Sequence, residues 1–202
     1  MQELAENELV VIRHAPAETG GRMAGRRDVP ARIDAAAAQA LAARLGRPAH
    51  LACSPALRCR QTAEALWPGA ALQIDPRLWE QDFGAHEGLP YAELPDLGPL
   101  TRAQLARIAA PGGESFAAMV ARVTPALQEL TTRARRGGPV VMLAHAGTAR
   151  AALALALGDT PAALAFEIAP LSLTRLRCLD DGLSIVQVAG APVADSQTPE
   201  CP

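Results

Sequence analysis

The 202-residue chain contains no lysine, so all 19 of its basic residues are arginines. Any phosphate site in it must therefore use arginine, histidine, backbone N–H groups or a helix N-terminus. Its four cysteines have neither CxxC nor metal-type spacing, which argues against a disulfide framework and favours a reducing, cytoplasmic setting. No apolar run approaches the roughly 20 residues of a membrane span. The acidic residues 1–8 carry no basic or apolar signal-peptide region.

Other classes are disfavoured by charge and by missing motifs. A net charge of −2 gives no sign of nucleic acid or anionic membrane as a partner. Neither GxGxxG nor GxxxxGK[ST] occurs, which argues against a nucleotide-binding Rossmann or P-loop protein. With half of its residues hydrophobic, the chain can form one substantial core. We predict a single domain over residues 1–188, an insertion over the site at 89–113 and a loose tail at 189–202, in a monomer or homodimer.

Strand-like and helix-like segments alternate along the chain. The predicted strands are Leu9–Ile12, His50–Cys53, Ala71–Ile74, Val140–Ala144, Leu171–Cys178 and Leu183–Val188. The predicted helices are Ala31–Leu45, Ser54–Leu66 with Ser54 as its N-cap, Ser115–Arg135 and Gly147–Leu157. This alternation predicts an α/β fold with three layers, α/β/α, around a mostly parallel sheet. The last two strands flank a turn and form an antiparallel edge.

Two predicted strands end in the same way. Arg13 and His14 follow Leu9–Ile12, and His145 follows Val140–Ala144. If these strands are parallel neighbours about 5 Å apart, both imidazoles reach one pocket. Arg58, one turn into a helix after a strand, adds a second arginine. Two arginines and two histidines around one volume fit a dianionic phosphoryl group, and the amides at the start of the helix after His145, including that of Ala146, would add donors.

Five motifs in order along the chain resemble those of the histidine phosphatase superfamily, the phosphoglycerate-mutase-like fold. They run from Val10 to about Leu157: Arg13-His14, Ser54-Pro55-x-x-Arg58-x-x-x-Thr62-Ala63, Leu78-x-Glu80-x-x-x-Gly84-x-x-Glu87-Gly88, Pro111-Gly112-Gly113-Glu114-Ser115 and His145-Ala146-Gly147. Two positions depart from the family pattern, because Ala15 and Ala146 stand where the family has glycine. At both positions the backbone must therefore have a negative φ, or the loop must tolerate strain.

The resemblance implies a phosphoric monoester hydrolase of the histidine acid phosphatase type, acting on a small phosphorylated metabolite without metal or cofactor. His14 would become phosphohistidine, while Arg13, Arg58 and His145 hold the transferring oxygens. Glu80 would protonate the leaving oxygen, with Asp82 and Glu87 as alternatives.

The sequence indicates the preferred substrate less clearly than the reaction. Arg22, in a glycine-rich loop, and His86, in the acidic loop, are candidate substrate contacts, as is Arg150. In the family that this chain resembles, mutases have a longer segment after the acidic loop, with extra basic residues. The segment 89–110 is short and holds only two basic residues, so the resemblance favours a phosphatase over a cofactor-dependent phosphoglycerate mutase. The overall length resembles the α-ribazole phosphatase branch. The mutase and a non-catalytic phosphate-binding relative remain the alternatives.

Overall fold

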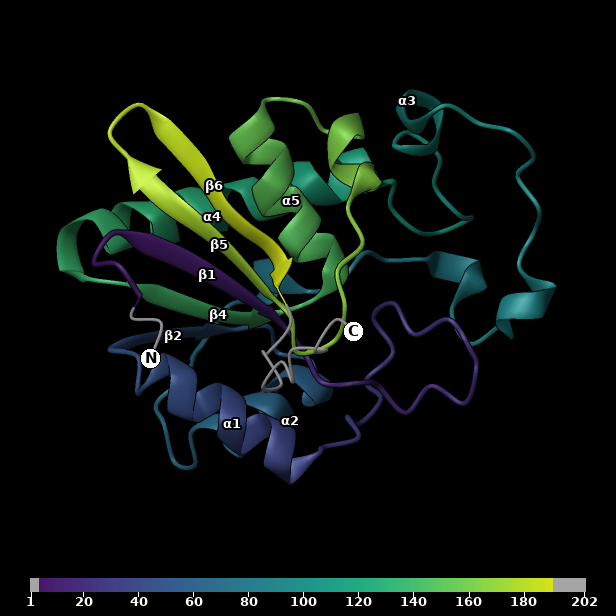
Figure 1. The fold of residues 1–202 in the computed structure, drawn as a ribbon. Helices are drawn as coiled ribbons and strands as arrows, with labels where there is room; N and C mark the ends of the chain where they lie inside the picture. Colours follow the sequence, from purple (N-terminus) through teal and green to yellow (C-terminus); the bar gives the residue numbers. More distant parts are fainter. Residues whose placement is uncertain (1–3, 191–202) are drawn as a thin grey trace, which may run out of the picture.

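The computed structural model describes residues 4–190, which form a three-layer α/β/α fold around a six-stranded sheet (Figure 1). The strand order is β3–β2–β4–β1–β5–β6. Strands β1 to β4 are parallel, and β5 and β6 form the antiparallel edge. The strands are β1 (Glu8–Arg13), β2 (His50–Cys53), β3 (Gln73–Ile74), β4 (Val140–Ala144), β5 (Leu173–Leu179) and β6 (Gly182–Gly190). The predicted fold class is confirmed.

Helices cover both faces of the sheet, with α1 and α2 on one face and α4 and α5 on the other (Figure 1). The helices are α1 (Ala35–Leu45), α2 (Leu57–Leu66), α3 (Arg102–Leu105), α4 (Phe116–Gly137) and α5 (Ala146–Leu157). Short 3₁₀ turns lie at Pro76–Leu78, Gly84–His86, Tyr91–Glu93 and Pro161–Ala165. Among residues 4–190, no helix is both long and apolar enough to cross a membrane.

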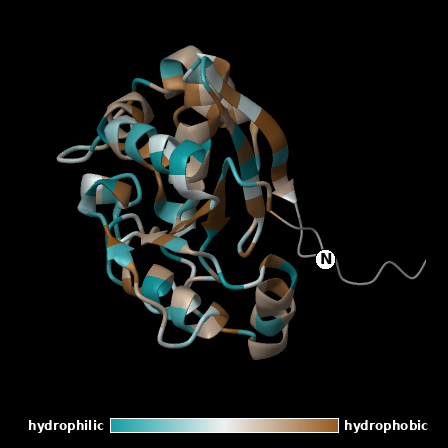
Figure 2. Cartoon of the chain, turned by 90° about the vertical axis from the view of Figure 1, so that its left-hand side faces the viewer, coloured by the Kyte–Doolittle hydropathy of each residue, from teal (hydrophilic) through white to brown (hydrophobic). Residues whose placement is uncertain are grey.

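The continuous hydrophobic strands are explained by burial on both faces. Along β1, Leu9 and Val11 pack against α4 and α5, whereas Val10 and Ile12 pack against α1 and α2. All four side chains are fully buried. A strand covered on both faces needs apolar residues at every position rather than at alternate ones. In Figure 2, hydrophobic residues accordingly gather on the central strands, while the helices alternate between the two colours.

Several predicted boundaries are wrong for local reasons. Helix α1 begins at Ala35 and not at Ala31, because the Asp34 side chain accepts hydrogen bonds from the amides of Ala36 and Ala37. Helix α2 begins at Leu57, so Ser54 is not its N-cap. The Asp28 carboxylate instead accepts from the Leu57 amide.

At the carboxyl end of the described chain, strand β5 begins two residues later than predicted. Strand β6 includes residues 189 and 190, which were predicted as the start of the tail. The rest of that tail, 191–202, lies outside the described residues. In the middle of the chain, β3 is confined to Gln73–Ile74, half the predicted length.

A buried ion pair joins the first strand to the antiparallel edge. Glu8 is 0% exposed, and its Oε2 accepts from Arg175 Nε at 2.9 Å and from Nη2 at 2.7 Å. Arg177 Nη2 lies 3.7 Å from the other oxygen, and its side chain is half-exposed. A carboxylate removed from water needs such a partner, because an uncompensated buried charge is strongly destabilising.

This pair gives a stability prediction. Arg175→Ala should lower the free energy of unfolding by about 3–5 kcal/mol, because it leaves the Glu8 carboxylate buried and unpaired. The half-exposed neighbour provides the control, and Arg177→Ala should cost less than about 1 kcal/mol. Urea unfolding followed by circular dichroism measures both values. Equal losses of stability in the two variants would contradict the conclusion that Arg175 is the main partner of the buried Glu8 carboxylate.

Candidate active site

The carboxyl ends of β1 and β4 bring the two histidines together. The strands pair in parallel, with Arg13 opposite Ala144, and the His14 amide donates to the Ala144 carbonyl at 2.9 Å. The centroids of the His14 and His145 rings lie 5.2 Å apart in an edge-on arrangement. Both side chains are buried. The expected juxtaposition of two histidines at neighbouring strand ends is therefore present in the structure.

Hydrogen bonds fix which nitrogen of His14 carries the proton. Its Nδ1 lies 2.6 Å from the carbonyl oxygen of Ala15, which can only accept, so Nδ1 is the protonated nitrogen. Arg58 Nε donates to His14 Nε2 at 3.3 Å, which requires a lone pair on Nε2. Burial, aided by the charges of Arg58 and Arg13, lowers the pKa of His14 to about 3. His14 is thus a neutral imidazole with a nucleophilic Nε2.

His145 has the opposite tautomer. Arg58 Nη2 donates to its Nδ1 at 3.3 Å, so the proton is on Nε2, which donates to Ser54 Oγ at 2.8 Å. The ring stacks on Trp79 with an interplanar angle of 8°. Burial and the nearby Arg58 hold the pKa of His145 well below its usual range. The hydroxyl of Ser54, predicted to cap a helix, serves here to orient this ring.

Arg58 connects the histidines to the loop that follows β1. Although only 1% exposed, it donates from Nη1 to the Arg27 carbonyl at 2.9 Å and from Nη2 to the Gly25 carbonyl at 2.7 Å. Its own carbonyl accepts from Thr62 Oγ1, which accepts in turn from the Ala15 amide at 3.0 Å. Two residues of the predicted Ser-Pro-x-x-Arg-x-x-x-Thr motif therefore position His14. Arg58 donates to its ring, and Thr62 accepts from the backbone amide that follows it.

Arg13 presents an unpaired donor. Its Nη1 donates to the Ile168 carbonyl, whereas its Nε is buried and has no hydrogen-bond partner among the described residues. Burial lowers the pKa of this guanidinium from its ordinary value. A buried donor without a partner is costly.

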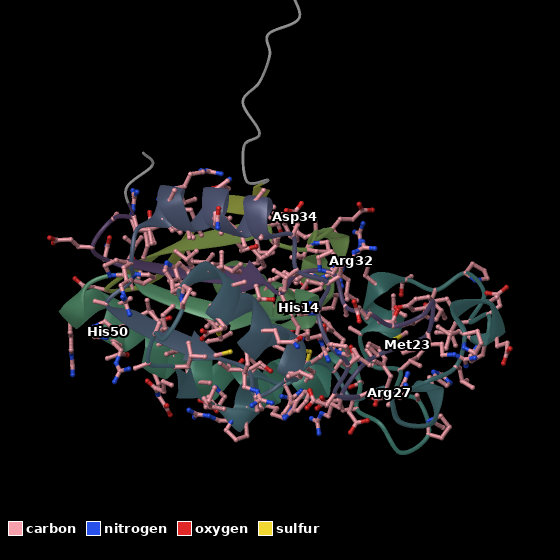
Figure 3. The ribbon with its side chains drawn as sticks, turned by 90° about the horizontal axis from the view of Figure 1, so that it is seen from below. His14, Met23, Arg27, Arg32, Asp34 and His50 are labelled. Atoms are coloured by element: carbon pink, nitrogen blue, oxygen red, sulfur yellow. The ribbon has the colours of Figure 1, made fainter. Side chains whose placement is uncertain are left out.

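A cavity of about 220 Å³ lies in front of these groups. Of the predicted site residues, Arg13, His14, Arg58 and Glu80 line it, whereas His145 is fully buried and does not. Met23, which lines the cavity, and Arg27 lie on the loop beside His14, whereas His50 lies at the opposite end of the sheet (Figure 3). None of the remaining lining residues was named from the sequence as a catalytic or binding residue: Ala17, Thr19, Met23, Ala24, Gly25, Phe83 and Tyr91.

The structure separates Glu80 from the two alternative acids. Glu80 Oε2 accepts from the Gly147 amide at 3.3 Å, and Oε1 accepts from the Gln81 amide. Asp82 accepts from the Gly84 amide and pairs with Arg26, and Glu87 accepts from the Arg26 and Phe83 amides. Neither alternative lines the cavity.

Gly147 allows Glu80 to approach the start of α5. A Cβ at position 147 would lie 2.2 Å from Glu80 Oε1, which is closer than any real contact. Steric exclusion therefore explains why glycine stands at position 147 in the His145-Ala146-Gly147 motif. The Gly147 amide, expected to be open for phosphate, is occupied by Glu80 instead.

A network that sequence reasoning missed holds the acidic loop. Arg122 donates to the Glu80 carbonyl at 3.3 Å and to the Trp79 carbonyl at 3.2 Å, and pairs with Glu114. Glu114 also accepts from the Asp82 amide at 3.1 Å and from Arg26. Glu114 belongs to the motif Pro111-Gly112-Gly113-Glu114-Ser115, but the motif alone does not indicate which groups this glutamate binds.

The remaining predicted contacts lie outside this cavity. Arg22 is exposed and donates to the Gly88 carbonyl at 2.9 Å. His86 and Arg150 line an adjoining cavity, and Ala146 lines neither. Among residues 4–190, no group of three or more histidine, cysteine, aspartate or glutamate side chains could hold a metal ion.

The two alanines at family glycine positions are accommodated without strain. Among the described residues, only Leu171 and Ala189 have a positive φ outside glycine, so neither Ala15 nor Ala146 does. The Ala15 methyl belongs to the core packed against α1 and α2 and is 1% exposed. The extra methyl therefore points into the core and leaves the cavity unobstructed.

Comparison with known proteins identifies the family. The model of the histidine phosphatase superfamily (branch 1) matches residues 9–190. The bifunctional protein Rv2228c of Mycobacterium tuberculosis is 34% identical over 161 residues, which cover 74% of this chain but 44% of that protein. The chain thus spans less than half the length of the curated relatives it matches.

Solved structures agree with this family. A mycobacterial glucosyl-3-phosphoglycerate phosphatase in complex with VO3 is 28% identical, covers 92% of this chain and 99% of its own, and has a TM-score of 0.75. A phosphoserine phosphatase mutant from Entamoeba histolytica, in complex with phosphoserine, shares the fold with a TM-score of 0.78 at 18% identity, covering 91% and 97%. The chain belongs to the histidine phosphatase superfamily, branch 1.

Proposed function

We propose that this protein is a cytoplasmic phosphomonoesterase that hydrolyses a small phosphorylated metabolite through a phosphohistidine on His14. The observation that carries the proposal is the tautomer of His14. Its Nδ1–H is bonded to the Ala15 carbonyl, so the lone pair is on Nε2, where it accepts from Arg58 Nε. His14 lines a cavity together with two arginines and a carboxylate. A neutral imidazole is a competent nucleophile at physiological pH.

The reaction would proceed in two displacements. In the first, His14 Nε2 bonds to phosphorus as the bond to the ester oxygen breaks, and Glu80 gives its proton to that oxygen. In the second, water attacks phosphorus, its proton passes to the Glu80 carboxylate, and the P–N bond breaks. The guanidinium groups of Arg13 and Arg58 would bind the equatorial oxygens, where charge is spread in the transition state. Both arginines line the cavity together with His14, which supports this role.

The neighbours suggest where to look for the substrate. Phosphatases of glucosyl-3-phosphoglycerate and of phosphoserine have this fold. The α-ribazole phosphatase branch remains a prediction from length and loop. A panel of these three esters and p-nitrophenyl phosphate covers the candidates, with mutase and phosphate-binding assays for the two alternatives.

Replacing the nucleophile gives the first test of the mechanism. His14→Ala should lower kcat/KM on the best ester of the panel at least about a thousandfold, because the covalent step is lost. Brief exposure of the wild type to labelled substrate, with an alkaline quench, should trap label on a histidine, and the variant should trap none. Full activity in His14→Ala would exclude the phosphohistidine, and 2,3-bisphosphoglycerate-dependent mutase activity would exclude the phosphatase. Phosphate binding with no turnover in the wild type would favour the non-catalytic alternative.

The leaving group separates Glu80 from the other acids. Glu80→Gln should lower kcat/KM for an alkyl phosphate by about 10²–10⁴-fold, because an alkoxide must be protonated as it leaves. The same variant should lose far less on p-nitrophenyl phosphate, whose phenolate needs no proton. Asp82→Asn and Glu87→Gln are the matched controls, and both should slow the two substrates equally. If one of these controls shows the leaving-group dependence instead, that residue is the acid.

The neutrality of His14 also predicts how stability depends on pH. Because its pKa is about 3 in the folded protein and 6.5 in the unfolded chain, the unfolded chain binds more protons below pH 6.5. Stability should be complete above that pH and fall by about 2 kcal/mol between pH 6.5 and 5 through this residue alone. Urea unfolding at several pH values measures the slope. His14→Asn should reduce the slope and leave the part that comes from His145, whose pKa is also lowered by burial. An unchanged slope in the variant would show that His14 is not neutral in the folded protein.

A further inference from the structure

The cavity in front of His14, which is lined by Arg13, Arg58 and Glu80, is called the phosphate cavity below. A second cavity adjoins it and is mostly apolar. Its volume is about 320 Å³, and it shares Met23 and Phe83 with the phosphate cavity. Leu94, Leu97, Leu105 and Ile108 contribute apolar walls from the 89–113 segment. This segment, which includes α3, lies beyond the carboxyl ends of the parallel strands (Figure 1). The two cavities therefore form one site with a charged part and an apolar part.

The apolar walls are open to water. Leu97, Leu105 and Ile108 are 47%, 41% and 37% exposed, and Tyr91, on the phosphate cavity, is 54% exposed. Large apolar side chains exposed singly are ordinary, but several around one concave surface mark a binding site. The volume falls within the range, about 300–1,000 Å³, that pockets for small molecules occupy.

The polar groups of this cavity restrict the ligand further. Gln81 donates from Nε2 to the Glu114 carbonyl at 2.9 Å, and Arg150 donates from Nε to the Phe166 carbonyl at 2.9 Å. His86 is the other polar side chain, and no carboxylate lines the cavity. An ammonium group, as in phosphoserine, would find no counter-charge there. A sugar would leave most of its hydroxyls without partners, which costs affinity.

We propose that this cavity binds the organic group of the substrate, so that the enzyme prefers phosphomonoesters with an apolar chain or ring. This inference rests on the proposed phosphatase activity. Phe83 lines both cavities and lies on the same loop as Glu80. An ester oxygen protonated by Glu80 would therefore direct its substituent past Phe83 and Met23 into the apolar cavity.

A series of primary alkyl monoesters isolates this effect. Ethyl, butyl, hexyl and 2-phenylethyl phosphate have closely similar leaving groups, so differences in kcat/KM report binding of the substituent and not chemistry. Each buried methylene is worth about three- to fourfold at most, so hexyl phosphate should exceed ethyl phosphate at least about tenfold. Phosphoethanolamine, in which an ammonium replaces an apolar end, should be the poorest of the set. A flat series, or a preference for phosphoethanolamine, would overturn the inference.

Paired variants locate the effect in the cavity. The double change Leu105→Asn and Ile108→Asn replaces apolar side chains with polar ones and adds no charge that would repel phosphate. It should lower kcat/KM for hexyl and 2-phenylethyl phosphate about tenfold and leave ethyl phosphate within a factor of two. Leu157→Asn is the control, because Leu157 is 44% exposed at the end of α5 and lines neither cavity. Equal losses across the series would overturn the inference.

Phosphonates separate this inference from the proposed function. Methyl-, butyl- and hexylphosphonate cannot be hydrolysed, so calorimetry measures their affinity whether or not the protein turns over esters. Affinity that rises along the series supports the apolar subsite even if no ester is hydrolysed, in which case the phosphatase proposal alone fails. Equal affinities overturn the subsite even where hydrolysis is rapid.

Discussion

The site depends on Arg58, a cation buried in the protein without an ion pair among residues 4–190. Its guanidinium donates to two backbone carbonyls and to one nitrogen on each histidine. These bonds satisfy the donors but leave the charge uncompensated, and both imidazoles must therefore accept from it and stay neutral. The same group thus selects the tautomer of His14 and that of His145. A phosphate dianion bound beside Arg58 would compensate this charge, which favours binding of an anion.

A second set of contacts fixes Glu80, the proposed acid. Glu80 is held from three directions: by the Gly147 amide at the start of α5, by its own loop, and by Arg122 on α4. Arg122 depends in turn on Glu114, which also bonds the backbone of Asp82. The Pro-Gly-Gly-Glu-Ser motif is therefore a support for the acidic loop more than 30 residues before it. Preorganisation of this kind avoids reorganising dipoles during the reaction.

The sequence predicted best those features that a single strand determines. Continuous apolar runs specified β1 and β4, and a histidine after each run specified two neighbouring imidazoles, because parallel neighbours end at one edge of a sheet. The expectation that both imidazoles reach one pocket is wrong for His145, which is fully buried and does not line the cavity. The sequence could not separate Glu80 from Asp82 and Glu87. That distinction depends on which amides each carboxylate accepts from, and those amides lie on α5, on the loop after β1 and within the acidic loop itself. Ser54 and Glu8 were misread or missed for the same reason, since their partners, His145 and Arg175, are 91 and 167 residues away.

The two cavities also differ in how well they tolerate substitution. The phosphate cavity is made from strand ends and buried polar groups that bond one another, so a change at Arg58 or Thr62 disturbs His14 as well. The apolar cavity takes most of its walls from exposed side chains on a segment with one short helix, where substitutions disturb little packing. Substrate preference can therefore vary within such a fold while the chemistry stays fixed. Arginine suits the buried cavity, because it combines a permanent charge with planar donors that fit both carbonyl and phosphate oxygens.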